Sequence, residues 1–277
     1  MINNRFSVLM SVYLKENHIF LREALESIYF KQSLKPNEIV IVKDGSLNED
    51  LDAVLEEYKQ KLPDVVKIVG YENNRGLGYA LNYGLNECTN EIICRMDSDD
   101  ISVPDRFKIQ IKRFEENDDL VILGSNIEEF DQKPGDLKRE RKVYSLYSDI
   151  IKNMYLKSPF NHMTVVFKKT LVQKAGGYED IFEHEDHHLW IRILKKFYGE
   201  NIDENLVLAR TGNDLIGRRH GLLSFKREID FQNSLIQRRL INMNNYLINI
   251  LFRALPKLLP KKILGIIYDR ILRKSFK

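Results

Sequence analysis

Three aspartates and a serine follow an apolar run that is typical of a buried β-strand. The tetrad Asp97-Ser98-Asp99-Asp100 comes directly after Glu91–Met96. Carboxylates this close together repel one another, and a divalent cation is the usual way to hold several of them. The D-x-D spacing puts Asp97 and Asp99 on the same side of an extended segment. The tetrad therefore predicts a site for Mg²⁺ or Mn²⁺; an acidic turn that caps the next helix is the plainer alternative.

Two further polar positions lie just past predicted strands. Tyr13 follows the run Phe6–Val12, and Asp44 follows Glu38–Val42. In parallel sheets with helices on both faces, ligands bind beyond the carboxyl ends of the strands. An aspartate there can accept a hydrogen bond from a nucleobase, and a tyrosine ring can stack on the base. An ordinary turn between strand and helix is the alternative for Asp44.

The segment His184-Glu185-Asp186-His187-His188 contains the pattern H-E-x-x-H. On a helix, His184 and His188 share a face and could bind zinc, with Glu185 as general base. A zinc protease needs a third ligand, for which Glu204 and His220 are candidates, although both lie in strand or loop contexts.

Two other interpretations of the same segment stay open. In one, Asp186 points from the helix start into a cleft and acts as a general base that deprotonates a hydroxyl, with Trp190 four residues further on. In the other, the segment is only the exposed polar first turn of a helix.

Weaker candidates for binding lie around this segment. Asn161 and His162 precede a predicted strand, where they either cap it or bind substrate. Arg218 and Arg219 follow the last predicted core strand. Beside a carboxylate-bound metal such a cationic pair can hold a diphosphate, whereas elsewhere it is a solvated surface.

The elements that must position these residues alternate over the first 125 residues. We expect strands at 6–12, 38–42, 65–69 and 91–96, with single helices after Asn17, at 49–60, at 77–87 and after Pro104-Asp105. Single helices between strands imply an α/β fold with a doubly wound, mostly parallel, Rossmann-like sheet. We further expect a nucleotide-binding half at about 1–125 and an acceptor half at about 126–225.

Composition excludes several classes of protein. The 277 residues are 43% hydrophobic and 30% charged, which is typical of a globular chain. Two cysteines are too few for a disulfide framework, so we expect a reducing cytoplasm. The N-terminus lacks a signal-peptide pattern, and we find no uncharged apolar stretch long enough to span a bilayer.

The last part of the chain is basic. Residues 226–277 carry twelve Lys and Arg against three Asp and Glu, so the rest of the chain is net acidic. We expect a basic amphipathic helical tail that binds an anionic membrane surface and makes the protein peripheral at the inner face of the plasma membrane. A helix pair packed on the domain is the alternative. The residues between the cations are mostly aliphatic, which argues against nucleic acid.

Taken together, these motifs resemble the inverting nucleotide-sugar glycosyltransferases of family 2, which have the GT-A fold. The resemblance runs from about residue 5 to 225 and is closest to bacterial enzymes that build exopolysaccharide, capsule or O-antigen repeat units. It rests on the segments SVLMSVY, VKDGS, NNRGLGYALNYGL, MDSDDISVPDRF, FNHMTVVFKK, GGYEDIFEHEDHHLW and RRHG.

The resemblance implies a role for each site residue. Asp99 is the direct metal ligand, for Mn²⁺ or Mg²⁺, and Asp186 is the catalytic base. The residues implied to contact acceptor or diphosphate are Asn161, His162, Glu185, Trp190, Arg218 and Arg219. The nucleotide, which we expect to be UDP, is contacted by Ser11, Tyr13, Asp44, Arg75, Asp97 and Ser98. His184 and His187 stand where the family often has an aromatic or small residue.

The implied reaction needs one base. The acceptor hydroxyl, on a glycan or a polyprenyl-linked sugar, attacks the anomeric carbon while the nucleoside diphosphate leaves, and a single displacement inverts configuration. A non-catalytic, membrane-associated nucleotide-binding protein is the other alternative, alongside the zinc protease.

Overall fold

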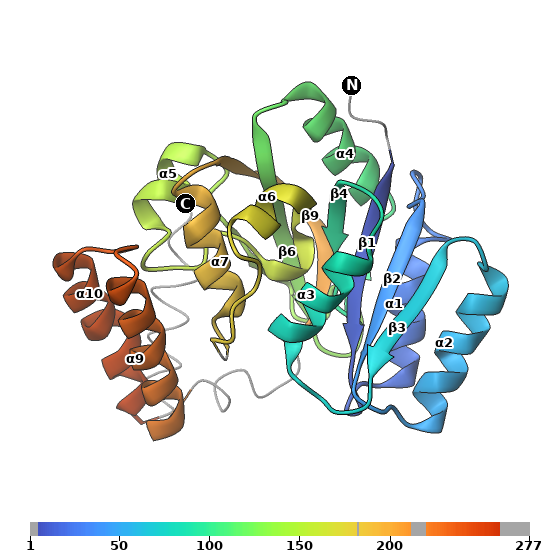
Figure 1. Ribbon diagram of the computed structural model, residues 1–277, viewed down its shortest axis with the longest axis horizontal. Coiled ribbons are helices and arrows are strands. Elements are labelled where there is room, and N and C mark those ends of the chain that lie inside the picture. Colours follow the sequence, from blue (N-terminus) through green and yellow to red (C-terminus); the bar gives the residue numbers. More distant parts are fainter. Residues whose placement is uncertain (1–4, 182, 212–219, 261–277) are drawn as a thin grey trace.

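The computed structural model describes residues 5–181, 183–211 and 220–260 (Figure 1). Within these ranges the strands form one mixed sheet in the order β3-β2-β1-β4-β8-β6-β9-β5, and β7 pairs with β6. The strands are β1 Phe6–Val12, β2 Glu38–Asp44, β3 Val66–Tyr71, β4 Ile92–Arg95, β5 Ile101–Ser102, β6 Leu120–Phe130, β7 Arg139–Arg141, β8 Val166–Lys168 and β9 Tyr198–Arg210. The first four neighbours are parallel, as expected, whereas β8 runs antiparallel to β4 and β6.

Helices follow the strands much as the sequence predicts. The α-helices are α1 His18–Ile28, α2 Glu49–Lys61, α3 Leu77–Glu87, α4 Arg106–Glu116, α5 Tyr147–Asn153, α6 Lys169–Lys174, α7 Glu185–Leu194, α9 Leu222–Gln237 and α10 Met243–Asn249. Three short helical turns are η1 His162–Thr164, η2 Ile250–Ala254 and η3 Leu255–Leu258. Asn17 caps α1, as expected, because its side chain accepts a hydrogen bond of 2.8 Å from the Ile19 amide.

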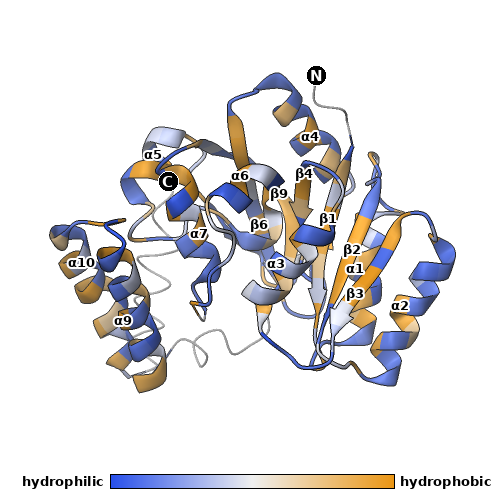
Figure 2. Ribbon diagram, viewed as in Figure 1, coloured by the Kyte–Doolittle hydropathy of each residue, from blue (hydrophilic) through white to orange (hydrophobic). Residues whose placement is uncertain are grey.

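The sheet separates two hydrophobic cores (Figure 2). In β1, Phe6, Val8 and Met10 face the core that α1, α2 and α4 complete, and Leu9 faces the other, which α3, α5, α6 and α7 complete. Side chains alternate between the two faces of a strand, so apolar residues on both faces identify a strand that is covered on both sides. The result is a three-layer arrangement that leaves the carboxyl ends of β1, β2 and β4 open to a ligand.

The alternating pattern of helices and strands does not predict β6, which lies between β8 and β9. Its apolar start is followed by polar residues, yet nearly every residue from Leu120 to Phe130 is buried. The expected border between two halves near residue 125 falls inside this strand. The two halves expected from the sequence therefore share one continuous sheet.

The described part of the C-terminal region packs on the domain. We call α9, α10, η2 and η3 the extension. In a third apolar cluster, Phe231 and Leu235 of α9 and Ile241, between α9 and α10, group with Ile191 of α7. Figure 1 shows α9 and α10 side by side at the left of the molecule. Within the described residues, none of the helices is both long and apolar enough to cross a membrane.

Candidate active site

A cluster of three carboxylates follows β4. One oxygen from each of Asp97, Asp99 and Asp100 lies within 4.8 Å of the others. Arg95 forms an ion pair with Asp97, and the Arg210 amide donates a 2.8 Å hydrogen bond to Asp100 Oδ1. Asp100 Oδ2 is buried and has no hydrogen-bond partner among the described residues. An unpartnered buried carboxylate oxygen beside two other carboxylates suits a hard divalent cation.

The pKa values of the carboxyls in the cluster are raised, because nearby arginines do not offset burial and mutual repulsion. Burial, and then the charge of Asp97, raise the pKa of Asp99 to about 6. The pKa of Asp100 is raised well above its usual range by burial and by the same neighbours. Glu16, in the loop after β1, joins the cluster, because burial, Asp99 and Asp97 raise its pKa to about 7. A bound divalent cation would relieve this repulsion.

Asp44, at the end of β2, holds the loop that leads into α3. Its Oδ1 accepts hydrogen bonds from the Tyr71 hydroxyl at 2.9 Å and the Arg75 amide at 2.7 Å. Its Oδ2 accepts from Asn74 Nδ2 at 2.9 Å and the Gly76 amide at 3.1 Å. These four bonds use the usual acceptor capacity of a carboxylate. In this structure Asp44 therefore orders the loop of residues 74–76.

The other predicted nucleotide contacts come from several elements. Ser11 is half-buried on β1 and pairs in register with Val42 of β2. Tyr13 is 40% exposed just beyond β1. The guanidinium of Arg75 lies 3.6 Å from the centre of the Tyr79 ring. Ser98, within the carboxylate cluster, is buried.

Asp186 lies in the first turn of α7, where a helix dipole favours negative charge. It is half-buried, and its Oδ1 accepts a 2.6 Å hydrogen bond from the His187 amide. Burial, and then the charge of Asp186, raise the pKa of the neighbouring Glu185 to about 7.

Tyr178 and Arg95 link the two groups of acids. Burial raises the pKa of the Tyr178 hydroxyl; Arg95 opposes this shift, whereas the charges of Asp186, Glu185 and Asp97 add to it. The charges of all these groups influence the pKa of one hydroxyl. The cluster after β4 and the start of α7 therefore lie near the same tyrosine. Sequence reasoning did not select Glu16, Arg95 or Tyr178 for the site, because their partners come from distant segments.

Two residues predicted to contact acceptor or diphosphate are fully buried. Asn161 Nδ2 donates to the Ser125 carbonyl at 2.8 Å. Trp190 packs edge-on against Phe160. Asn161 Oδ1 and Trp190 Nε1 have no hydrogen-bond partner among the described residues, and contact of these side chains with a ligand stays a prediction. His162 Nε2 lies 3.2 Å from the Tyr178 hydroxyl, and Arg218 and Arg219 lie outside the described residues.

The family follows from a comparison with known sequences. Residues 7–174 match the model of glycosyl transferase family 2, which is more than half of the chain. The chain belongs to glycosyltransferase family 2.

Curated relatives of this glycosyltransferase span its whole length. A UDP-Gal:alpha-D-GlcNAc-diphosphoundecaprenol beta-1,3-galactosyltransferase of Escherichia coli is 38% identical over 98% of this chain and 97% of the relative. An amylovoran biosynthesis glycosyltransferase of Erwinia amylovora is 36% identical over 96% of this chain and 98% of its own.

Solved structures support the GT-A fold. A mannosyltransferase from Pyrobaculum calidifontis, in complex with GDP-Man and Mn²⁺, superposes with a TM-score of 0.65 at 16% identity, over 96% of this chain and 75% of its own. The S. aureus protein TarS, residues 1–349 in complex with UDP-GlcNAc, gives 0.63 at 19% identity, over 84% and 66%. The expected fold and enzyme class are thus confirmed.

The zinc-protease alternative is wrong for this glycosyltransferase. Of the two histidines proposed to bind zinc, His184 lies 3.3 Å from Glu228 Oε2 through Nε2, and His188 Nδ1 accepts from Arg192 Nε at 3.1 Å. Among the described residues, the aspartates after β4 are the only group of three or more His, Cys, Asp or Glu that could hold a metal. The non-catalytic alternative is excluded by membership of an enzyme family.

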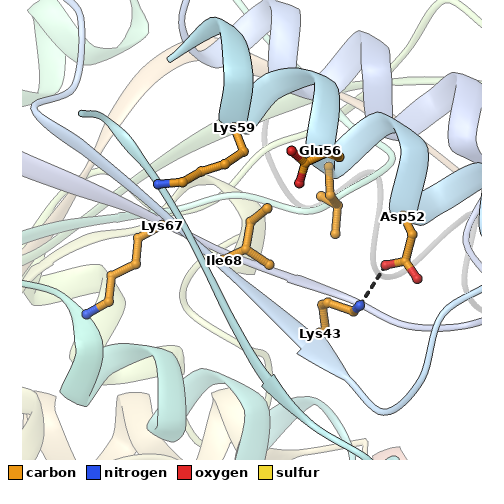
Figure 3. Close-up of a pocket in the computed structure, with 7 residues that line it drawn as sticks. Lys43, Asp52, Glu56, Lys59, Lys67 and Ile68 are labelled. Carbon is orange, nitrogen blue, oxygen red and sulfur yellow. Dashed lines mark ion pairs between the residues drawn. The ribbon is translucent and has the colours of Figure 1, made fainter. Parts of the chain in front are cut away.

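A surface hollow of about 470 Å³ lies away from this site, between α2 and β3 (Figure 3). Its lysines already have partners: Lys43 pairs with Asp52 at 2.6 Å, and Lys67 pairs with Glu87 at 2.7 Å. Lys59 donates to the Val66 carbonyl at 2.7 Å. Each of these lysines is therefore already engaged by a carboxylate or a backbone carbonyl.

Proposed function

We propose that this glycosyltransferase moves a sugar from a UDP-sugar to a hydroxyl of a glycan or polyprenyl-diphosphate-linked acceptor, with inversion, during assembly of a bacterial surface polysaccharide. One observation carries the proposal: a carboxylate cluster whose charge Arg95 offsets only in part lies with the acids that begin α7 around Arg95 and Tyr178. The printed activity of the E. coli relative supports the donor and acceptor classes, given an identity of 38% over 98% of this chain.

On the donor side of the proposed site, one group of residues would hold a metal at the diphosphate and another would contact the base. Asp99, together with Asp97 and Asp100, would hold Mn²⁺ or Mg²⁺, which when bound neutralises charge on the departing diphosphate. Tyr13 offers a partly exposed ring for the base. Asp44 fixes the loop of residues 74–76, in which Arg75 is exposed and has its guanidinium 3.6 Å from the centre of the Tyr79 ring.

The acceptor side needs one proton acceptor. Asp186 removes the proton of the acceptor hydroxyl as that oxygen attacks the anomeric carbon opposite the diphosphate. A single displacement of this kind inverts configuration, so no nucleophilic carboxylate is required. Glu185, whose pKa is raised to about 7 by burial and by Asp186, lies beside the base.

A turnover screen of UDP-, GDP- and dTDP-sugars with Mn²⁺ tests the donor, using a GlcNAc-α-diphosphate lipid as acceptor probe.

We expect Asp186→Asn to lower kcat by about 10²-fold or more with donor affinity nearly unchanged, the scale of a lost general base. Asp230→Asn is the control, because Asp230 is exposed on α9. Equal rates in both variants would refute the assignment of the base, and product of retained anomeric configuration would refute the inverting mechanism.

We also propose that the extension holds the enzyme at the inner face of the membrane. Leu247, Leu251 and Phe252 are each more than half exposed, and Leu255 and Leu258 continue the same apolar surface. Two cations that sequence reasoning assigned to lipid, Arg253 and Lys257, turn inward instead and pair with Glu228 at 2.7 and 3.4 Å. Apolar contact therefore replaces part of the expected electrostatic attraction, to which the six cations of residues 261–277, outside the described residues, would add.

Co-sedimentation with phosphatidylglycerol vesicles tests this location. We expect the full chain to pellet with the vesicles and Leu251→Glu/Phe252→Glu to remain largely in the supernatant. Leu146→Glu is the matched control, because Leu146 is 64% exposed at the start of α5, outside the extension. Equal sedimentation of all three proteins would contradict the proposal.

A further inference from the structure

The two histidines that flank Glu185 and Asp186 are both held by the extension. The ring of His184, which precedes α7, stacks on Phe231 of α9, with centroids 4.6 Å apart and planes at 24°. The ring of His187 lies 5.1 Å from the same phenylalanine. One side chain of the extension therefore contacts the residues on both sides of the acidic pair.

A buried ion cluster adds a second link. Glu228 of α9 is 1% exposed, and its Oε2 lies 3.3 Å from His184 Nε2. Burial alone would raise the pKa of this carboxyl, but Arg253 and His184 hold it well below its usual range. A buried charge is stable only when it is paired in this way.

Arg253 continues the link to the other flank of the pair. Its Nη1 donates to the Leu156 carbonyl at 2.8 Å and lies 3.4 Å from His187 Nδ1. His187 in turn meets the Met154 carbonyl at 2.6 Å through Nε2. The extension thus reaches the catalytic helix and the turn after α5 through one guanidinium.

We propose that Glu228 is a positioning residue, which acts through His184 and, by way of Arg253, through His187 to hold the first turn of α7 in the orientation that presents Asp186. This inference rests on the proposed role of Asp186 as base. It explains why histidines occupy two positions where the family resemblance leads one to expect aromatic or small residues. Small displacements of a catalytic group are costly, since an error of 1 Å can lower a rate by about 10²-fold.

Two variants and one control separate positioning from simple folding of the extension. His184→Phe keeps an aromatic ring for Phe231 and removes the nitrogen that faces Glu228. Glu228→Gln keeps the shape and removes the charge. Tyr246→Phe is the control, because the Tyr246 hydroxyl donates to Asn233 Oδ1 within the extension at 2.9 Å. All are compared well below their melting temperatures.

Hydrogen–deuterium exchange of the peptide covering residues 184–190 is the first measurement. We expect faster exchange there in His184→Phe and Glu228→Gln, and wild-type exchange in Tyr246→Phe. The second measurement is turnover of UDP-galactose with the GlcNAc-α-diphosphate lipid. We expect kcat to fall about 10-fold or more in both variants while the donor KM changes less than twofold.

A double variant tests whether the two residues act as a unit. If Glu228 acts through His184, adding His184→Phe to Glu228→Gln lowers kcat little further. Unchanged exchange at residues 184–190, or an unchanged kcat while Asp186→Asn abolishes turnover, would overturn the positioning role. An Asp186→Asn enzyme that turns over normally would instead overturn the proposed base. The exchange result alone would then decide whether Glu228 holds the first turn of α7.

Discussion

Two groups of buried acids in this glycosyltransferase have opposite electrostatics. After β4, Asp99 and Asp100 have raised pKa values because burial and neighbouring carboxylates outweigh the nearby arginines. In the extension, Glu228 has a lowered pKa because Arg253 and His184 outweigh its burial. Arginines offset the charge of the first group only in part, which supports the proposed metal, whereas the second group is paired with cations of the chain itself. A buried acid therefore indicates a ligand site only when the fold leaves its charge uncompensated.

Replacing Asp99 should give the largest effect on activity. We expect Asp99→Asn to lower transfer by about 10³-fold or more, because several kcal/mol of charge stabilisation at the diphosphate depend on the metal. Its melting temperature without metal should be unchanged or higher, since the fold disfavours an ionised Asp99. Initial rates and thermal melts check both, with exposed Asp119→Asn as control. Mn²⁺-dependent UDP binding that survives in Asp99→Asn would break the contrast.

Replacing Glu228 should have the opposite effect on stability. We expect Glu228→Gln to lower the free energy of unfolding by about 3–5 kcal/mol, because Arg253 and Lys257 would remain buried without their counter-charge. Urea denaturation measures this change. If Glu228→Gln and Asp99→Asn proved equally stable without metal, the distinction between the two groups would be lost.

The smallest expected effect is the pH dependence of stabilisation by Mn²⁺. The pKa of Asp99 is about 6 in the folded protein, above its ordinary value of 3.8. The folded state therefore binds more protons between these values, and without metal its stability falls as pH rises through that window. Metal competes with those protons, so Mn²⁺ should raise the melting temperature more at pH 7.5 than at pH 5. An equal rise at both values, or the same profile in Asp99→Asn, would contradict this.

Local patterns determined much of the fold and part of the site. The strand before Asp97, the cap of α1 by Asn17 and the span of α3 all depend on residues close in sequence, and each was predicted. The repulsion among Asp97, Asp99 and Asp100 is equally local, which is why the tetrad alone indicates a cation site.

Only the tertiary structure decided which residues from distant parts of the chain contact these strands and site residues. β6 enters the sheet beside strands that follow it by dozens of residues, so local polarity misrepresents its burial. The acceptor capacity of Asp44 is used by a loop some thirty residues away, and Asp99 acts on Glu16 from about eighty residues later in the chain. His184 resembles a zinc ligand by spacing but faces Glu228 and Phe231. Spacing along a helix fixes which side chains share a face, whereas the element packed against that face determines their partners and hence their chemistry.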